Sequence, residues 1–404
     1  MAAARRAGVQ LTAVCGGRGN CGQCRVQIRS GEVSPLTDTE TRFLSAAETQ
    51  EGFRLACQTR VLSDLKVNVP GLSLVATQRT QVESIELKVP VDPLVEAYEL
   101  SVSPATKEDI RSDADRLLDA LRDRYGLDEV ELDVRMLRRF PGGLRSNDWA
   151  GVAILRGREL IDFVPPKQPC LGFAADLGTT KVAGYLVDLD TGRLVASEGR
   201  MNPQVSYGED VMARITYAMG GTAQEATLRR VIVDLFNQML AEMCRRVGTS
   251  PEAVVEAVVV GNTAMHHLFL GLPTRQLGLA PYVAAVSGAL DVKARDVGLA
   301  IAPGAYVHLL PNIAGFVGAD HVAMLLATEL YREEGVVAGL DIGTNTEVAL
   351  RADGRLWTCS TASGPAFEGA HIKDGMRATD GAIEHVLLEN GEVSYQTIGD
   401  VAPI

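Results

Sequence analysis

The stretch Cys15-Gly-Gly-Arg-Gly-Asn-Cys21-Gly-Gln-Cys24 decides how the N-terminal part of this chain folds, and a fourth cysteine follows in Leu55-Ala-Cys57-Gln. Three thiolates in one glycine-rich loop, joined by a fourth that the fold returns to it, are the ligand pattern of a [2Fe-2S] cluster. Glycine suits such a loop because inorganic sulfide must lie against backbone N–H groups, which side chains would block. The spacing therefore predicts an electron carrier with Cys15, Cys21, Cys24 and Cys57 as metal ligands.

Four cysteines could instead form two disulfides or one zinc site. The chain has seven cysteines, an odd number, and no signal peptide, which disfavours disulfides. Zinc sites usually pair one CxxC with a second CxxC or with two histidines, whereas here the second half is Cys57 alone and the first histidine is His266. A cluster is therefore the favoured interpretation. The other cysteines are isolated, and a buried apolar position is expected for each of them: Cys170, Cys244 and Cys359.

The residues around the cysteines predict a small sheet with a short helix. Residues 25–29 alternate apolar and polar residues as a strand does, and residues 65–69 form another strand. Thr37-Asp-Thr-Glu40 fits a capping box that opens one helix through Ala47. A ferredoxin fold normally begins with a β-hairpin, but residues 1–14 have the pattern of a helix end and a loop. We therefore expect the first hairpin to be absent.

Length and composition limit the classes of function. A chain of 404 residues is expected to form about two to four domains, and a hydrophobic content of 46% is enough for buried cores. No apolar run reaches the length of a membrane helix, so no membrane association is expected. The formal net charge of −12 disfavours nucleic acid as a partner. A cytoplasmic protein is expected.

A connector and a small α/β unit follow the cysteine region. Residues 70–95 are polar and have an extended pattern. Residues 106–122 have the periodicity of a helix, with Ile110 and Leu117 on its apolar side. No catalytic constellation occurs in this unit, which favours a spacer or docking module. The proline-rich residues 165–169 mark the next boundary.

Beyond residue 169 the chain contains a duplicated signal. The first copy is Gly172-Phe-Ala-Ala-Asp176-Leu-Gly178-Thr179-Thr180, and the second is Val337-Ala-Gly-Leu-Asp341-Ile-Gly343-Thr344-Asn345. In each copy an apolar strand runs into an Asp-x-Gly-Thr turn, and another strand follows. One such turn would be a weak signal. Two copies at this separation predict two related subdomains that face a common cleft.

The turns have the chemistry of a phosphate site. Glycine lets the backbone approach an anion closely, successive N–H groups form a nest for phosphate oxygens, and threonine hydroxyls add donors. The aspartate at each strand end, Asp176 or Asp341, can hold hydrated Mg²⁺ between phosphates and is the candidate catalytic residue. The predicted nucleotide-binding residues are Gly178, Thr179, Thr180, Gly343, Thr344 and Asn345.

Other segments could line the same cleft. A strand over residues 258–261 runs into a helix with Asn262 or Thr263 near its cap. The adjacent His266 and His267 cannot share one helix face, so packing or cleft lining is expected for them. The glycine-rich loop that contains His371 is compatible both with contact to substrate or nucleotide and with a structural role.

The paired turns resemble those of the acetate and sugar kinase/Hsp70/actin superfamily of ATPases. Together with the cysteine loop, the segments GNTAMHHLFLG, LPNIAGFVGAD, DIGTNTE and STASGPAFEGAHIKDGMRA resemble the reductive activators of corrinoid proteins over essentially the whole chain. The resemblance implies a multidomain fold of the α/β and α+β classes. Its expected parts are a truncated β-grasp ferredoxin-like domain (1–72), a linker with a small α/β domain (73–168), and the two subdomains of an actin-like/Hsp70-like ATPase fold that is incomplete at the C-terminus (169–335 and 336–404).

In that family the protein uses ATP to help deliver one low-potential electron to cobalt(II) in a partner corrinoid protein, which regains cobalt(I). The resemblance therefore implies a [2Fe-2S] cluster, ATP with Mg²⁺, a corrinoid protein such as a methyltransferase component as partner, and an upstream electron donor. A homodimer is also expected. The chain departs from the family pattern because the first ferredoxin hairpin and the adenosine-contacting segment are missing, so we expect full function from a longer gene product.

Two other functions are compatible with the same residues. A small-molecule kinase of the same superfamily, with a ferredoxin appendage, would phosphorylate a metabolite, and Glu347 or Asp320 could serve as its base. An electron-transfer module could instead keep its ATPase half only as a non-hydrolysing docking scaffold. The intact turn at Asp341 and Thr344 disfavours that scaffold, because a dead site need not keep glycine and threonine together.

Overall fold

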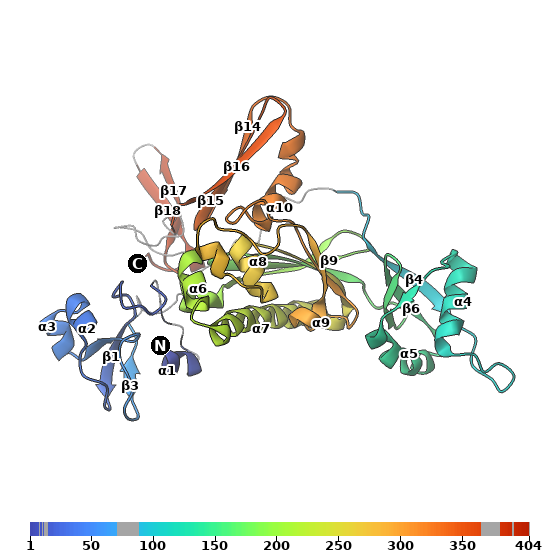
Figure 1. The fold of residues 1–404 in the computed structure, drawn as a ribbon, viewed down its shortest axis with the longest axis horizontal. Coiled ribbons are helices and arrows are strands. Elements are labelled where there is room, and N and C mark those ends of the chain that lie inside the picture. Colours follow the sequence, from blue (N-terminus) through green and yellow to red (C-terminus); the bar gives the residue numbers. More distant parts are fainter. Residues whose placement is uncertain are drawn as a thin grey trace.

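A six-stranded sheet with the order β10-β9-β8-β11-β13-β12 forms the central body of the molecule (Figure 1). The structure is a computed structural model, and it describes residues 1–7, 9, 11, 15–70, 89–364, 380–389 and 392–403. Three strands run parallel, namely β8 (Leu171–Leu177), β11 (Val254–Val260) and β13 (Tyr306–Leu309). Antiparallel to their neighbours are β9 (Lys181–Asp188), β10 (Leu194–Met201) and β12 (Leu290–Lys293).

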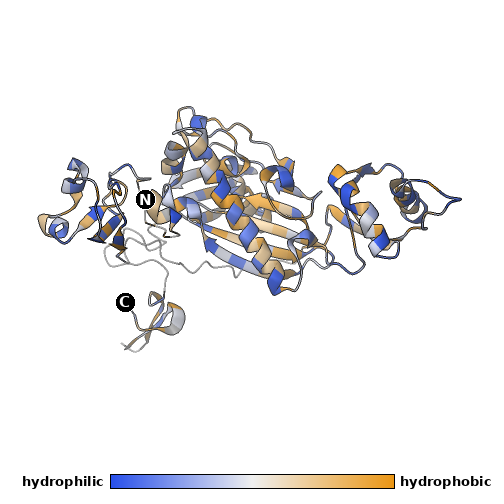
Figure 2. Ribbon diagram, turned by 90° about the horizontal axis from the view of Figure 1, so that it is seen from below, coloured by the Kyte–Doolittle hydropathy of each residue, from blue (hydrophilic) through white to orange (hydrophobic). Residues whose placement is uncertain are grey.

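Helices pack on this sheet and share its core. Phe236 of α7 lies between Phe173 of β8 and Phe269 of α8, with ring centroids 5.8 Å and 5.6 Å apart. Figure 2 shows apolar residues concentrated on the strands of this central sheet. The helices are α6 (Val211–Ala218), α7 (Thr222–Arg246), α8 (Thr263–Leu270), α9 (Ala294–Val297) and α10 (Ala319–Thr328), with the 3₁₀ turns η2 (Pro203–Ser206), η3 (Pro251–Ala253), η4 (Arg275–Gly278) and η5 (Leu330–Arg332).

The N-terminal residues form a three-stranded antiparallel sheet in the order β2-β1-β3. The capping box at Thr37 and Glu40 is confirmed, but the prediction of one helix through Ala47 was wrong. The first helix ends because Ser45 begins a second capping box with Glu48, which starts another helix. The elements are α1 (Ala2–Arg6), β1 (Arg25–Ser30), α2 (Asp38–Phe43), α3 (Ala46–Gln50), β2 (Phe53–Leu55) and β3 (Lys66–Asn68).

The small α/β unit is a four-stranded sheet in the order β4-β6-β7-β5 with two helices. The predicted helix over residues 106–122 begins later than expected. Ser112 caps it by accepting a hydrogen bond from the Asp115 N–H, so Ile110 precedes the helix and is 86% exposed, whereas Leu117 is buried as predicted. The elements are β4 (Val95–Ser101), α4 (Asp113–Tyr125), β5 (Glu131–Leu132), α5 (Val134–Ser146), β6 (Ala150–Arg156) and β7 (Glu159–Val164).

The C-terminal residues form an antiparallel sheet, β14-β15-β16, and a separate hairpin, β17-β18. The two predicted strand–turn–strand units are confirmed as β8–β9 and β14–β15. Cys170 and Cys244 are buried as expected, but the same prediction for Cys359 was wrong, because β16 is an edge strand whose residues are largely exposed. The elements are β14 (Val337–Ile342), β15 (Asn345–Ala352), β16 (Arg355–Ala362), β17 (Ile383–Glu389), β18 (Glu392–Thr397) and η7 (Ile398–Asp400).

The N-terminal sheet and the four-stranded sheet lie on opposite sides of the central body, and β14, β15 and β16 rise from it beside α10 (Figure 1). Among the helices that the structure describes, none has both the length and the apolar character required to span a membrane.

Candidate functional sites

The four predicted metal-binding cysteines lie in two pairs. Cys15 and Cys21, in the loop before β1, have sulfur atoms 3.4 Å apart. Cys24 ends that loop and Cys57 follows β2, and a hydrogen bond from the Cys24 thiol lowers the pKa of Cys57 to about 6. The antiparallel pairing of β1 with β2 brings this second pair together. The pairing extends past the ends of the strands as a hydrogen bond of 2.8 Å from the Ala56 N–H to the Cys24 carbonyl.

The arrangement of the four cysteines in two pairs suits a two-iron cluster. A cluster of two irons with four thiolate ligands needs two thiolates at each iron, which is the paired arrangement seen here. The cysteines therefore fit a [2Fe-2S] group, with one pair available for each iron.

The loop that carries three of the cysteines, residues 15–24, rests on the central body. Gly16 has a φ of +62°, a left-handed conformation that favours glycine. A Cβ atom on Gly16 would lie 2.8 Å from the carbonyl oxygen of Tyr207, which belongs to the segment between η2 and α6. Within the loop, Arg18 Nε donates a hydrogen bond of 2.9 Å to the Cys15 carbonyl. The loop is thus closely seated on this segment.

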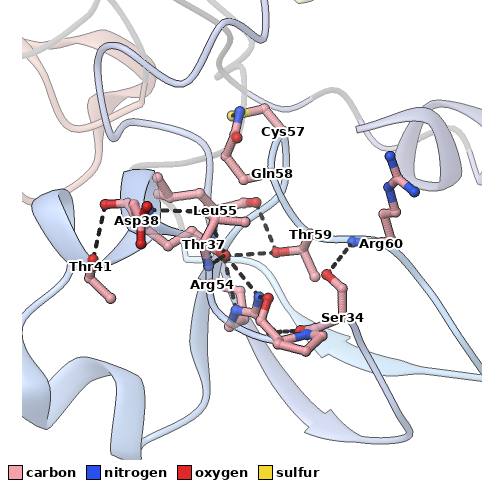
Figure 3. A network of polar contacts seen from close by, with 12 residues as sticks. Ser34, Thr37, Asp38, Thr41, Arg54, Leu55, Cys57, Gln58, Thr59 and Arg60 are labelled. Carbon is pink, nitrogen blue, oxygen red and sulfur yellow. Dashed lines mark hydrogen bonds and ion pairs between the residues drawn. The ribbon is translucent and has the colours of Figure 1, made fainter.

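The buried carboxylate of Glu40 holds the segment around Cys57; Figure 3 labels three of its partners, Arg54, Leu55 and Thr59. Glu40 is fully buried and accepts hydrogen bonds from Arg54 Nε at 2.9 Å, the Leu55 N–H at 3.1 Å and Thr59 Oγ1 at 3.0 Å. Burial alone would raise the pKa of Glu40, but the hydrogen bonds from Arg54 and from backbone N–H groups lower it to about 2. Because Leu55 and Thr59 lie on either side of Cys57, Glu40 fixes the position of the fourth cysteine.

The two predicted phosphate turns line one pocket of about 250 Å³. They touch directly, since Thr180 Oγ1 and Thr344 Oγ1 are 2.8 Å apart. Asn262 caps α8, as predicted, and its Nδ2 donates a hydrogen bond of 2.9 Å to Thr179 Oγ1. The pocket lining includes every residue predicted for this site, namely Asp176, Gly178, Thr179, Thr180, Asp341, Gly343, Thr344 and Asn345.

Two buried side chains that sequence reasoning missed hold the first turn by its carbonyl groups. Asn202 Nδ2 donates a hydrogen bond of 2.8 Å to the Gly178 carbonyl, and the Asn202 N–H donates one of the same length to the Thr180 carbonyl. Arg214 donates to the Thr179 carbonyl. Both side chains come from segments well outside the Asp-x-Gly-Thr motif, so the motif gives no indication of them.

Four carboxyl groups face the same pocket. Asp176 is open to the pocket yet lies deep between the turns, where burial raises its pKa to about 7 and repulsion from Asp320 and Asp341 adds to the effect. Burial also raises the pKa of Asp320 to about 6, that of Glu347 to about 7, and that of Asp341. A bound cation would favour the ionised forms of all four. The sequence had suggested Asp320 and Glu347 only as a base for a kinase.

The adjacent histidines are part of the packing. His266 and His267 are buried, and His267 Nδ1 lies 2.7 Å from the Thr263 carbonyl while its Nε2 accepts a hydrogen bond of 2.9 Å from the Ala285 N–H. This agrees with the structural role expected for them. The predicted loop around His371 lies outside the described residues.

Comparison with known proteins covers most of the chain. Four family models match it in order: the 2Fe-2S iron-sulfur cluster binding domain (residues 1–62), the RACo linker region (84–168), the RACo middle region (171–333) and the C-terminal domain of RACo, the ASKHA domain (336–404). The fold is therefore a mixed α/β multidomain architecture with an iron–sulfur domain and an actin-like ATPase domain, as the resemblance implied.

Individual relatives agree with these models. The corrinoid activation enzyme RamQ of Eubacterium limosum is 33% identical over 401 residues, which are 98% of this chain and 63% of RamQ. The [Co(II) methylated amine-specific corrinoid protein] reductase of Methanosarcina barkeri is 30% identical over 228 residues, 54% of this chain and 41% of that protein. A solved structure of a reductive activator for corrinoid, iron-sulfur protein superimposes with a TM-score of 0.68 at 32% identity, covering 100% of this chain and 67% of that one.

This chain thus spans a little under two thirds of the length of RamQ and contains, in order, the regions that define the RACo models. The protein belongs to the RACo family of reductive activators of corrinoid proteins.

Proposed function

We propose that the protein is an ATP-dependent reductive activator, which delivers one low-potential electron to cobalt(II) of a corrinoid protein and returns the cobalt to cobalt(I). The observation that carries this proposal is the presence, in one chain, of two cysteine pairs suited to a [2Fe-2S] cluster and of a pocket lined by two phosphate-type turns. Their order along the chain is that of the RACo models, and RamQ is named as a corrinoid activation enzyme.

The cysteine pairs define the redox half of the proposal. Cys15 and Cys21 would hold one iron, and Cys24 and Cys57 the other. When bound, the cluster supplies one-electron redox chemistry. An upstream donor provides one electron to the protein, and one electron leaves it for cobalt(II), so the exchange balances without a proton or leaving group.

The pocket defines the nucleotide half. Backbone N–H groups of both turns and the threonine hydroxyls would bind the phosphates of ATP. The carboxylates would hold Mg²⁺ through its hydration shell, which would also explain why so many acids share one pocket. The proposed phosphate ligands are Gly178, Thr179, Thr180, Gly343, Thr344 and Asn345, and the proposed magnesium-binding residues are Asp176, Asp320, Asp341 and Glu347.

Nucleotide is needed because the electron transfer can be uphill. Each 59 mV by which the potential of cobalt lies below that of the donor costs about 1.4 kcal/mol for one electron. ATP binding or hydrolysis would offset this cost by changing the complex with the corrinoid protein as the two subdomains close. Partner affinity and nucleotide state are then thermodynamically linked.

The test uses the cluster-loaded chain under anaerobic conditions. Chemically reduced protein is mixed with a cobalt(II) corrinoid protein, with and without ATP and Mg²⁺, and the cobalt(I) absorbance band is followed. We expect cobalt(I) to form faster, or to a greater extent, with ATP. Cys57→Ser should abolish the reaction together with the iron and acid-labile sulfide of the purified protein, whereas Cys359→Ser, at an exposed cysteine outside the site, should keep both.

Three results would contradict the proposal: purified protein that contains zinc in place of iron and sulfide, no cobalt(I) under any condition, or ATP-dependent phosphorylation of a metabolite without cobalt reduction. A methyltransferase component as the partner, the identity of the upstream donor, a homodimer and a cytoplasmic location stay predictions.

A further inference from the structure

A buried arginine joins the phosphate pocket to the surface on which the cysteine loop rests. Arg214 on α6 is fully buried and lies behind the first phosphate turn. Its guanidinium donates to the Thr179 carbonyl, to the Gly208 carbonyl at 2.9 Å and to Gln204 Oε1 at 3.3 Å. One rigid planar group therefore connects the turn to the segment between η2 and α6.

The cysteine loop rests on that same segment. The Cβ position of Gly16 lies 2.8 Å from the carbonyl oxygen of Tyr207 and 3.8 Å from that of Ala213. Tyr207 directly precedes Gly208, and Ala213 directly precedes Arg214. In Figure 1, α6 lies between the dark blue N-terminal loop and the central sheet. The two carbonyl groups nearest Gly16 thus lie one residue away from Gly208, whose carbonyl accepts a hydrogen bond from Arg214, and from Arg214 itself.

The arrangement also has an electrostatic consequence. The Arg214 side chain lies entirely inside the protein, and its hydrogen-bond acceptors are carbonyl and amide oxygens and the sulfur of Met265. Arginine remains protonated in proteins, so a positive charge stands directly behind a turn whose front lines the pocket. An anion in the pocket is attracted to this charge, and its binding will act on the hydrogen bond between Arg214 and Thr179.

We propose that Arg214 is a positioning residue that couples the phosphate turn to the cysteine loop, so that nucleotide in the pocket changes how Gly16 is seated on Tyr207 and Ala213. The coupling rests on the proposed function, because it needs ATP to occupy the pocket. It is reciprocal, so a change in the seating of the loop also changes the affinity for nucleotide. The route is short and continuous: pocket, Thr179, Arg214, the segment 207–213, and the loop.

Hydrogen–deuterium exchange of the intact, cluster-loaded protein tests both ends of this route. Exchange is measured with and without saturating ATP and Mg²⁺ in peptides that cover the turn, residues 176–182, and the loop, residues 15–24. In the wild type we expect ATP to slow exchange in the turn and to change exchange in the loop. Because the nucleotide is saturating, a variant with a lower affinity for ATP is still fully bound, so differences in affinity do not affect the comparison.

Two conservative variants distinguish a coupling role of Arg214 from the general effect of replacing a buried arginine. Arg214→Lys keeps the charge but cannot span both carbonyl groups, so the turn should still be protected while the response of the loop falls at least about fivefold, the lower end of the usual range of coupling effects. Arg116→Lys is the matched control. Arg116 is also buried and bonds to backbone carbonyls, but it lies on α4 in the four-stranded unit, and its variant should respond as the wild type does.

The outcomes are distinguishable. Protection of the turn without any change in the loop of the wild type would overturn the coupling and leave ATP binding intact, as would a wild-type response in Arg214→Lys. No protection of either segment would overturn the nucleotide half of the proposed function and the coupling with it. Should Arg214→Lys fail to fold, Gly16→Ala tests the other end, and we expect it to lose the loop response while the turn stays protected.

Discussion

Gly16 shows how one residue can serve two parts of the molecule. Its positive φ shapes the loop that carries Cys15, and its missing side chain lets the loop lie against the Tyr207 carbonyl. Gly17 beside it has a φ of +88°, but among the described residues a Cβ atom there would meet only the Cβ of Cys57, at an ordinary 4.0 Å. The two glycines therefore share the backbone requirement and differ in the contact with the central body.

This difference gives a matched pair of variants. Gly16→Ala and Gly17→Ala should each lose about 1 kcal/mol of unfolding free energy, because alanine is strained at positive φ. Only Gly16→Ala should also displace the loop from the segment 207–213, which denaturant melts and hydrogen–deuterium exchange of that segment can show. Equal exchange of residues 207–213 in both variants would mean that the loop does not depend on this close approach.

Two helices of the N-terminal unit begin with the same motif in different surroundings. Glu40 and Glu48 each occupy the N3 position of a capping box, as the third residue of α2 and of α3. Glu40 is fully buried against Arg54, whereas Glu48 is partly exposed and pairs with Arg25 at the surface. The motif sets the helix starts, and tertiary burial gives only Glu40 a further role.

Replacement by glutamine tests that distinction because it keeps the capping geometry and removes only the charge. Glu40→Gln leaves the guanidinium of Arg54 buried without a counter-ion and should cost about 3 kcal/mol of unfolding free energy. The Cys57 segment should loosen with it, so the iron and sulfide content should fall. Glu48→Gln should change thermal stability little and keep the cluster. Similar melting temperatures for the two variants would rule out the anchoring role of Glu40.

The acids that face the phosphate pocket should make stability depend on pH. The folded-state pKa of Glu347 is raised to about 7, above its ordinary value of 4.5. Its contribution to stability is thus fully present below about pH 4.5 and is lost as the pH rises through about 7. The reason is that Glu347 gives up its proton at a lower pH in the unfolded chain than in the folded one. Bound Mg²⁺ should reverse this loss.

Glu347→Gln should therefore match the wild type near pH 4 to 5 and exceed its unfolding free energy by roughly 1–2 kcal/mol at pH 8 without Mg²⁺, a figure discounted for water in the pocket. Because the variant and the wild type share all other titrating groups, the contributions of those groups cancel in the difference between the two unfolding free energies. Denaturant melts at several pH values, repeated with Mg²⁺, give the measurement. The gain in unfolding free energy of Glu347→Gln should depend on pH and should shrink with Mg²⁺. If either dependence were absent, Glu347 would not belong to the proposed magnesium site.

At the scale of the whole molecule, the four-stranded unit is joined to the central body by a charged network. Arg156 of β6 pairs with Glu256 of β11 at 2.8 Å and with Asp291 of β12 at 2.6 Å. Its guanidinium carbon lies 4.5 Å from the ring centroid of Tyr306, and Lys293 Nζ lies 3.9 Å from the same ring. Three strands of the central sheet, β11, β12 and β13, and one strand of the small unit thus meet at Arg156, which favours movement of the two parts as one body.

Arg156→Met should break this joint. Glu256 would lose its partner at a site where only 14% of its side chain is exposed, and we expect a loss of roughly 2 kcal/mol in unfolding free energy. The exposed pair of Arg332 with Glu329 provides the control, and Arg332→Met should change stability by less than about 1 kcal/mol. Both are read from thermal or denaturant melts. A cost for Arg156→Met no larger than that of the control would show that the network does not hold the two parts together.

The amino-acid sequence by itself determined the features that depend on residues close together in the chain. The strand alternation around residue 27, the capping box at Thr37, the cap at Asn262 and both strand–turn–strand units were predicted correctly, because backbone hydrogen bonding and side-chain periodicity act over a few residues. The helix break at Ser45 was also a local signal, but it was overlooked.

The tertiary structure decided the features that depend on contacts between distant segments. Burial of Glu40 beneath Cys57, exposure of Cys359 at a sheet edge, the gathering of Asp320 with Asp176 in one pocket, and the place of Arg214 behind the first turn have no short-range pattern. Burial and electrostatic environment are properties of the packed chain, and they emerge only when segments far apart in sequence come together.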